Sequence, residues 1–289
     1  FSLFTKNIWI FREKAVTLRH GSAPLLGAVK AMKTFHQIKA WLKHQLTACN
    51  TAGYGVHSPY LFYIVRYVLT DRNRYYVFSG IERERARLLR AKKAILANDY
   101  LTGQQGERRV CDIAEKSLKS PREAQLLMRL AVLQQVKDVV ELGTSFGITT
   151  AYMASAGSDV RVTTFEGVRE VAEEAKKVWK KLQIDNINLI FGNIDDTLSR
   201  FNQQKEIGLA FIDANSTEES AVRYFEYLAQ LAGEKSVFVL GDIHSSEGME
   251  RAWSKVCGNE RVTAAMDLFS IGLVFFDPHL EKRIYKIRF

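Results

Sequence analysis

The chain has 289 residues, of which 47% are hydrophobic, 25% are charged and only four are prolines. This composition is close to the average of globular proteins and excludes collagen-like, mucin-like and long disordered sequences. No run approaches the 18 or so apolar residues that a membrane-spanning helix needs, so we expect no membrane span.

The net charge of +9 is unevenly distributed along the chain. Residues 1–135 carry 23 Lys and Arg against 9 Asp and Glu, a balance of +14, whereas residues 136–289 carry 18 against 23, a balance of −5. A solvated basic helix face is the favoured interpretation of the first half, and a site for an acidic partner such as RNA is the alternative. No aromatic RNA-binding run accompanies the basic residues, which makes nucleic acid the less favoured partner.

Residues 1–31 precede an amphipathic run that begins at Met32, and we interpret them as an extension that the fold does not need. They have neither the basic leader nor the cleavage site of a signal peptide. The three cysteines are far apart and form no C-x-x-C pair, which favours a cytoplasmic location over a disulfide scaffold or a zinc site.

Residues 32–135 are predicted to form a helical, basic region, because their apolar residues recur mostly three and four positions apart. The most basic segment, residues 83–93, continues this spacing through Ile95 and Leu96, which predicts a helix with one buried stripe. We expect this region to cover the remainder of the chain.

Two Ser-Pro pairs predict helix starts in this region. Ser120 and Pro121 fit the N-cap and the first helical position, and Ser58 and Pro59 repeat the pattern directly after His57. For the second pair, contact with a substrate is the alternative to a structural cap.

From residue 136 onward, short β-rich runs alternate with helical stretches, which predicts a doubly wound, Rossmann-like α/β fold with a mostly parallel sheet. The expected strands are 138–142, 160–165, 187–191, 209–212 and 236–240, and the expected helices are 149–156, 168–182, 195–201 and 218–231. Two further runs, 262–268 and 271–276, are separated by two residues, which predicts a terminal antiparallel hairpin. Residues 136–289 thus form one predicted domain.

A glycine-containing turn, Val139-Val-Glu-Leu-Gly-Thr-Ser-Phe-Gly147, leads from the first of these strands into a helix. Ligands of doubly wound folds bind at the carboxyl ends of the strands, so this turn is the expected binding site. A dinucleotide-binding turn needs further glycines where this sequence has Ser145 and Ile148, which disfavours NAD and FAD.

The spacing of this turn resembles the E/D-x-G-x-x-x-G signature of class I S-adenosylmethionine (SAM)-dependent methyltransferases, and the resemblance covers residues 111–276. It implies that SAM binds to the turn, that a carboxylate after the second strand accepts hydrogen bonds from the ribose hydroxyls, and that a polar turn after the third strand lies beside the adenine. The residues that match these positions are Glu141, Gly143, Thr144, Ser145 and Gly147 in the first turn, Glu166 and Gly167 in the second, and Asn193 and Ile194 in the third.

Three segments resemble the metal-dependent catechol and caffeoyl-CoA O-methyltransferases and uncharacterised bacterial members of that branch: Ser120-Pro-Arg-Glu-Ala-Gln-Leu-Leu, Phe211-Ile-Asp213-Ala and Val239-Leu-Gly-Asp242. The resemblance implies catalytic roles for Asp213 and Asp242, contact of Asp213 with SAM, and Mg²⁺ as the ion that both aspartates would bind.

Two residues depart from that pattern. Ile243 replaces the asparagine that would be the third metal ligand, and Ser216 replaces the general-base lysine. His244 is then the candidate base or ligand, because its ordinary pKa is near neutrality, and Asn215 is a further oxygen donor. We therefore consider a bound metal doubtful and expect metal-free transfer.

The sequence thus predicts a SAM-dependent methyltransferase that transfers a methyl group to an oxygen of a small molecule. The arginines of the helical region favour an anionic acceptor. Two alternatives stay open: a SAM-binding protein without catalytic activity, and an RNA or protein methyltransferase that uses the basic first half. A homodimer is compatible with the sequence, which does not decide the oligomeric state.

Overall fold

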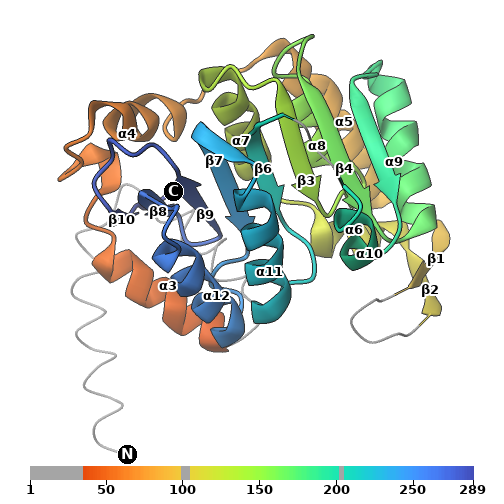
Figure 1. Ribbon diagram of the computed structural model, residues 1–289. Coiled ribbons are helices and arrows are strands. Elements are labelled where there is room, and N and C mark those ends of the chain that lie inside the picture. The colour runs from red at the N-terminus through yellow and green to blue at the C-terminus, as the bar shows by residue number, and fades with distance from the viewer. Residues whose placement is uncertain (1–34, 99–104, 202–204) are drawn as a thin grey trace, which may run out of the picture.

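The computed structural model describes residues 35–98, 105–201 and 205–289 (Figure 1). The proposed extension, residues 1–31, lies outside these ranges. No helix in the described ranges is both long enough and apolar enough to cross a membrane.

The described residues form an eight-stranded sheet with the order β10-β8-β9-β7-β6-β3-β4-β5. Its strands are β3 (Asp138–Leu142), β4 (Arg161–Glu166), β5 (Ile187–Phe191), β6 (Ile207–Ile212), β7 (Ala232–Gly241), β8 (Ala264–Asp267), β9 (Ile271–Phe275) and β10 (Arg283–Lys286). Strands β3 to β7 pair in parallel, and β9 is antiparallel to both β7 and β8. The predicted doubly wound fold and its terminal hairpin are confirmed. Strand β10, parallel to β8, was not predicted.

Helices cover both faces of this sheet (Figure 1). One face carries α7 (Pro121–Leu133), α8 (Ile148–Ala154) and α9 (Arg169–Leu182), and the other carries α10 (Ile194–Leu198), α11 (Glu218–Ala229) and α12 (Glu247–Gly258). Side chains of a strand point alternately to the two faces, so the neighbours Val139 and Val140 belong to different hydrophobic clusters. Helix α12 was not predicted.

The region before α7 is mostly helical, as predicted. It contains α3 (Phe35–Thr47), a short turn η1 (Thr51–Gly53), α4 (Pro59–Tyr63), η2 (Ile64–Val68), α5 (Tyr76–Arg90) and α6 (Val110–Ser117). Both predicted Ser-Pro caps are confirmed, because the Ser58 and Ser120 hydroxyls accept hydrogen bonds from the backbone N–H groups of Leu61 and Glu123.

The prediction that one helix continues through Ile95 and Leu96 was wrong. Helix α5 ends at Arg90, and these two residues lie in β1 (Ala94–Asn98), which pairs antiparallel with β2 (Gln105–Arg109). Successive side chains of a strand point to opposite faces, and these two residues follow that alternation: Ile95 is buried whereas Leu96 is 54% exposed.

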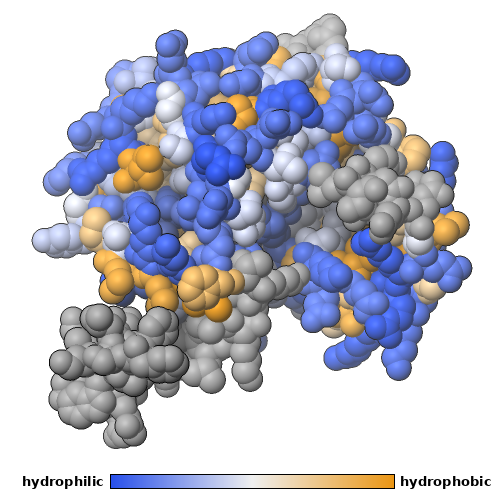
Figure 2. All heavy atoms as spheres, turned by 90° about the horizontal axis from the view of Figure 1, so that it is seen from below, coloured by the Kyte–Doolittle hydropathy of each residue, from blue (hydrophilic) through white to orange (hydrophobic). Residues whose placement is uncertain are grey.

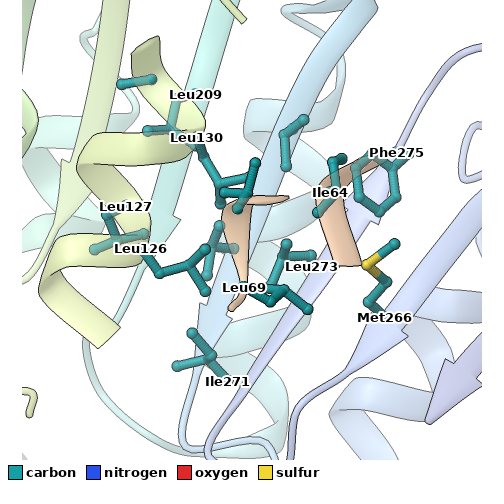
Figure 3. Packing of buried hydrophobic residues seen from close by; sticks show 14 of the residues in the cluster. Ile64, Leu69, Leu126, Leu127, Leu130, Leu209, Met266, Ile271, Leu273 and Phe275 are labelled. Carbon is teal, nitrogen blue, oxygen red and sulfur yellow. The ribbon is translucent and has the colours of Figure 1, made fainter. Parts of the chain in front are cut away.

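The helical region and the sheet share one hydrophobic core. Figure 3 shows Ile64 and Leu69 packed toward strand β9, which carries Leu273 and Phe275, with Leu130 of α7 alongside. This shared core fixes the helical region against one face of the sheet.

Two segments far apart in the sequence, around Asn50 and Lys286, are hydrogen-bonded to each other. The backbone N–H of Asn50 donates to the Lys286 carbonyl oxygen at 3.1 Å, and the N–H of Lys286 donates to Asn50 Oδ1 at 3.2 Å. Helix α3 lies beside α12 (Figure 1), and His36 Nε2 of α3 is 3.8 Å from Glu250 Oε1 of α12. The helical region is therefore held at the β10 edge of the sheet.

Candidate active site

The glycine turn follows β3 at the edge where the parallel strands end, which is the lower side of Figure 1 and the face seen in Figure 2. Gly143 has φ +98° and Gly147 has φ +72°, a region that favours glycine. A Cβ atom at Gly143 would lie 2.6 Å from the Asp213 carbonyl oxygen, and one at Gly147 would overlap the Trp179 indole. Both glycines are therefore needed for the backbone to pass this point.

A cavity of about 430 Å³ lies at this turn. The predicted SAM-binding residues that line it are Gly143, Ser145, Glu166, Gly167, Asn193, Ile194 and Asp213. The wall also includes residues that were not predicted, from β1, β2 and the end of α6: Ala97, Arg108, Ile113, Lys116, Ser117 and Lys119. The structure thus brings the three polar turns of the sequence analysis into one cavity.

Three predicted SAM-binding residues do not line this cavity. Glu141 is fully buried and accepts hydrogen bonds from the hydroxyls of Thr149 at 2.5 Å, Thr164 at 2.7 Å, and Thr150. Thr144 is buried against Thr164, with their hydroxyls 2.6 Å apart, and Gly147 is buried under Trp179. These residues lie beneath the turn, outside the lining of the cavity.

Glu166 lies at the end of β4 with its carboxylate on the cavity. Its Oε2 accepts a hydrogen bond from Ser145 N at 2.9 Å, and its Oε1 accepts one from Val168 N at 2.8 Å. Burial raises its pKa to about 7, and the backbone donors partly oppose that shift. Each oxygen keeps a second lone pair, so the carboxylate is able to accept hydrogen bonds from two adjacent hydroxyls.

Lys119 lies between the two aspartates that the sequence marked as catalytic. Its Nζ is 2.7 Å from Asp213 Oδ1 and 2.9 Å from Asp242 Oδ1, and its side chain is 10% exposed. Burial alone lowers the pKa of Lys119, but Asp213 and Asp242 outweigh this and hold the net pKa above its ordinary value. Lys119 is therefore a charged ammonium group that bridges two carboxylates.

The residues present do not fit a divalent ion at this point. The space between Asp213 and Asp242 holds the Lys119 ammonium, and Ile243 is buried in the core, where it offers no ligand. Within the described ranges, no three His, Cys, Asp or Glu residues are grouped to hold a metal.

A second cavity, of about 540 Å³, adjoins the first. It lies between α3, the α6–α7 connection and the loops after β7 and β8. Its wall includes Trp41, His44, Glu115, Glu123, His244, Phe269 and Phe289. Lys116, Ser117, Lys119 and Asp242 line both cavities, so the two share a wall.

His244 lies in the wall of the second cavity with both ring nitrogens engaged. Its Nδ1 is 2.8 Å from Glu250 Oε1, its Nε2 is 3.0 Å from Asp267 Oδ2, and its ring stacks on Phe269 at 5.3 Å between centroids. Burial alone lowers its pKa, but Asp267 and Glu250 outweigh this and raise the net pKa. In this arrangement, a protonated ring that donates to two carboxylates does not take a proton from an acceptor.

Lys119 was not predicted as a site residue, although it lies directly before the Ser120-Pro121 helix start. The arginines of residues 83–93 were predicted to lie on a solvated face, whereas Arg85 is buried and its Nη1 donates to the Lys119 carbonyl oxygen at 2.5 Å. The signal available for Lys119 was its position next to a helix start that the family resemblance already included.

Comparisons with known proteins found similar methyltransferases. Residues 140–243 match the family described as Methyltransferase domain. The chain is 27% identical over 130 residues to the O-methyltransferase imqG of Aspergillus flavus, and 30% identical over 132 residues to the catechol O-methyltransferase of Mycobacterium tuberculosis. These alignments cover 43% and 45% of this chain and only 52% and 59% of the two relatives.

Solved structures show the same fold. The O-methyltransferase TomG of Streptomyces achromogenes, in complex with SAM, matches with a TM-score of 0.53 at 18% identity, over 71% of this chain and 91% of that chain. The O-methyltransferase of Bacillus cereus, in complex with SAH, matches with a TM-score of 0.52 at 18% identity, over 71% and 93%. The strand order and these matches show that the described residues have the fold of SAM-dependent methyltransferases. In sequence, the chain is similar to O-methyltransferases.

Proposed function

We propose that this protein transfers the methyl group of SAM to an oxygen of a small molecule. The observation that carries the proposal is the pair of cavities with a shared wall. The first holds the glycine turn and Glu166, and the wall of the second includes aromatic side chains such as Trp41 and Phe269. A donor in one cavity and an acceptor in the other would meet at Lys119 and Asp242.

The first cavity fits SAM by the chemistry of its wall. Glu166 offers two acceptor oxygens for a ribose, and Asn193 and Ile194 lie on the side where the adenine would bind. Asp213 and Asp242 are acidic groups at the opposite side, where they favour a positively charged sulfur. When bound, SAM supplies an activated methyl group, so the protein has mainly to position the acceptor and exclude water.

Two residues of the shared wall are suited to handle the acceptor oxygen. The Asp242 side chain is 44% exposed and lines both cavities, so its carboxylate is placed to accept the proton of an acceptor hydroxyl. The Lys119 ammonium is placed to donate a hydrogen bond to the same oxygen. We assign His244 to the wall of the acceptor cavity, since both of its ring nitrogens are engaged.

The charges along the second cavity support a neutral acceptor rather than the anionic one expected from the sequence. Lys116 and Lys119 are outnumbered there by Glu115, Glu123 and Asp242. An anionic group would meet three carboxylates and two ammonium groups. A hydroxylated aromatic compound suits this wall better, because the ring would contact the aromatic side chains while the hydroxyl faces Asp242.

Calorimetry with SAM and SAH tests the cofactor assignment. Glu166→Ala is expected to weaken SAM binding by roughly 1.5–3 kcal/mol, or about ten- to a hundredfold, because it removes hydrogen bonds to a charged group. Glu173→Gln is the matched control, since Glu173 is exposed on α9 and pairs with Lys176. Unchanged SAM affinity in Glu166→Ala contradicts the assignment.

Incubation with methyl-labelled SAM and fractionated cell extract tests the acceptor class. We expect label in the small-molecule fraction. Label in RNA or protein would favour the alternative that uses the basic first half of the chain, and SAM binding with no label in any fraction would favour a non-catalytic SAM-binding protein.

We further propose a cytoplasmic location, which is supported by three free cysteines, Cys49, Cys111 and Cys257.

A further inference from the structure

Lys119 occupies a position in the fold that two aspartates from different strands define. Asp213 follows β6 and Asp242 follows β7, and these strands are neighbours in the sheet. Lys119 reaches this point from the connection between α6 and α7 and contacts one oxygen of each carboxylate, at 2.7 and 2.9 Å. The three residues form one cluster at the wall between the cavities, in which Lys119 and Asp213 are largely buried and Asp242 is 44% exposed.

The surrounding structure holds Lys119 in place. Arg85, which is 6% exposed, donates to its carbonyl oxygen, and the capping box of Ser120 and Glu123 fixes the next turn of the chain. Gly241 makes room for the cluster, because a Cβ atom there would overlap the Asp213 carboxylate and lie 3.2 Å from Lys119 Nζ. An ammonium held in this way is a permanent part of the site.

A divalent ion and a lysine ammonium compete for the same oxygens. Mg²⁺ and Mn²⁺ bind deprotonated carboxylates directly, and here Oδ1 of Asp213 and Oδ1 of Asp242 already contact the Lys119 ammonium. We propose that Lys119 is the built-in cation of this active site: it closes the Asp213–Asp242 pair to divalent metals and contacts the acceptor oxygen in their place.

This inference rests on the proposed function, and it narrows the class of molecule that accepts the methyl group. A metal ion is able to gather two oxygens of one substrate, whereas an ammonium has three N–H donors, of which Lys119 directs two at Asp213 and Asp242. One donor is left for the substrate. The acceptor therefore needs a single hydroxyl, and a neighbouring second hydroxyl confers no advantage in binding.

Titration with Mn²⁺, followed by electron paramagnetic resonance, tests the proposal without SAM or an acceptor. Wild-type protein is expected to show no saturable Mn²⁺ binding that depends on Asp213. Lys119→Ala frees the two carboxylates and is expected to gain saturable Mn²⁺ binding, with an affinity at least about tenfold above any residual binding by wild type. The double variant Lys119→Ala/Asp213→Asn should lose this binding, and Lys116→Ala, which removes a neighbouring lysine of the same wall, should not gain it.

The outcomes separate this inference from the proposed function. Saturable Mn²⁺ binding to wild type that Asp213→Asn abolishes would overturn the inference, whether or not the protein methylates anything. Lack of Mn²⁺ binding by a Lys119→Ala protein that still unfolds cooperatively would also overturn it. If Lys119→Ala does not fold, the wild-type titration alone decides. Once an acceptor is known, methylation by wild type should be unaffected by a chelator, and a compound with one hydroxyl should react as fast as its vicinal diol analogue.

Discussion

The hydroxyls of Ser117 and Ser145 lie 2.7 Å apart and join the end of α6 to the glycine turn. Ser145 adopts φ +49°, a left-handed conformation that is unusual for a residue other than glycine. The helical region thus contacts the wall of the first cavity at Ser145, where the backbone of the glycine turn is strained.

Removal of this hydrogen bond should loosen the turn. We expect Ser117→Ala to lower the free energy of unfolding by about 1 kcal/mol, the usual net contribution of one hydrogen bond, and to weaken SAM binding by about fivefold. Denaturant unfolding and calorimetry measure the two effects. Ser199→Ala is the control, because the exposed Ser199 hydroxyl donates only to Asp196 within α10 and its connection. Equal SAM affinity in both variants would show that the turn keeps its shape without Ser117.

The buried Glu141 should make stability depend on pH. Burial raises its pKa from 4.5 to about 7, so between these values the folded protein holds a proton that the unfolded chain has released. The stability that this provides is greatest at the acidic side and is lost as the pH rises to about 7, by at most about 3 kcal/mol at about 1.4 kcal/mol per pH unit. Glu141→Gln should flatten this part of the profile of unfolding free energy against pH. The exposed Glu219→Gln on α11 should leave the profile as in wild type.

Gly241 should not tolerate a side chain. In Gly241→Ala the new methyl group meets the Asp213 carboxylate and approaches Lys119, so we expect a loss of roughly 1–3 kcal/mol in unfolding free energy from overpacking. Gly258→Ala is the matched control, because a Cβ atom at this position in α12 meets no atom within 4 Å. A Gly241→Ala protein as stable as the control would mean that the Lys119 cluster has room to shift.

The ring of His244 should contribute a charge-dependent part of the stability. Its pKa is raised by Asp267 and Glu250, so the contribution is fully present below the unfolded-state pKa of about 6.5 and is lost as the pH rises through the higher folded-state value. The difference in unfolding free energy between wild type and His244→Gln should therefore be larger at about pH 6 than at about pH 9. His279→Gln, at an exposed position, is the control. A difference that does not change with pH would assign His244 to packing alone.

The sequence predicted the parallel sheet well because each of its strands is a short apolar run with turn residues at its ends. The predicted run 138–142 coincides with β3, and 187–191 coincides with β5. Since parallel strands end at one edge, the polar residues after four of them, including Glu166, Asp213 and Asp242, could be placed around one site.

Contacts between segments that are distant in the chain could not be predicted from the sequence. Lys119 meets Asp213 and Asp242 only because α7 packs on the sheet, and no local period reports such a contact. The pairing of β10 with β8 is likewise a matter of tertiary structure. Helix α12 is different: Met249, Trp253 and Val256 follow helical spacing and are buried, so a local signal was present and was not used.

The contact between Asn50 and Lys286 has a consequence for the order of folding. The second cavity is lined by both Trp41 and Phe289, so its wall is complete only when the last described residues have docked beside α3. The residues that line the first cavity all precede residue 243. During synthesis from the N-terminus, the lining of the first cavity is therefore made before Phe289, and the docking of the β10 segment beside α3 completes only the second cavity.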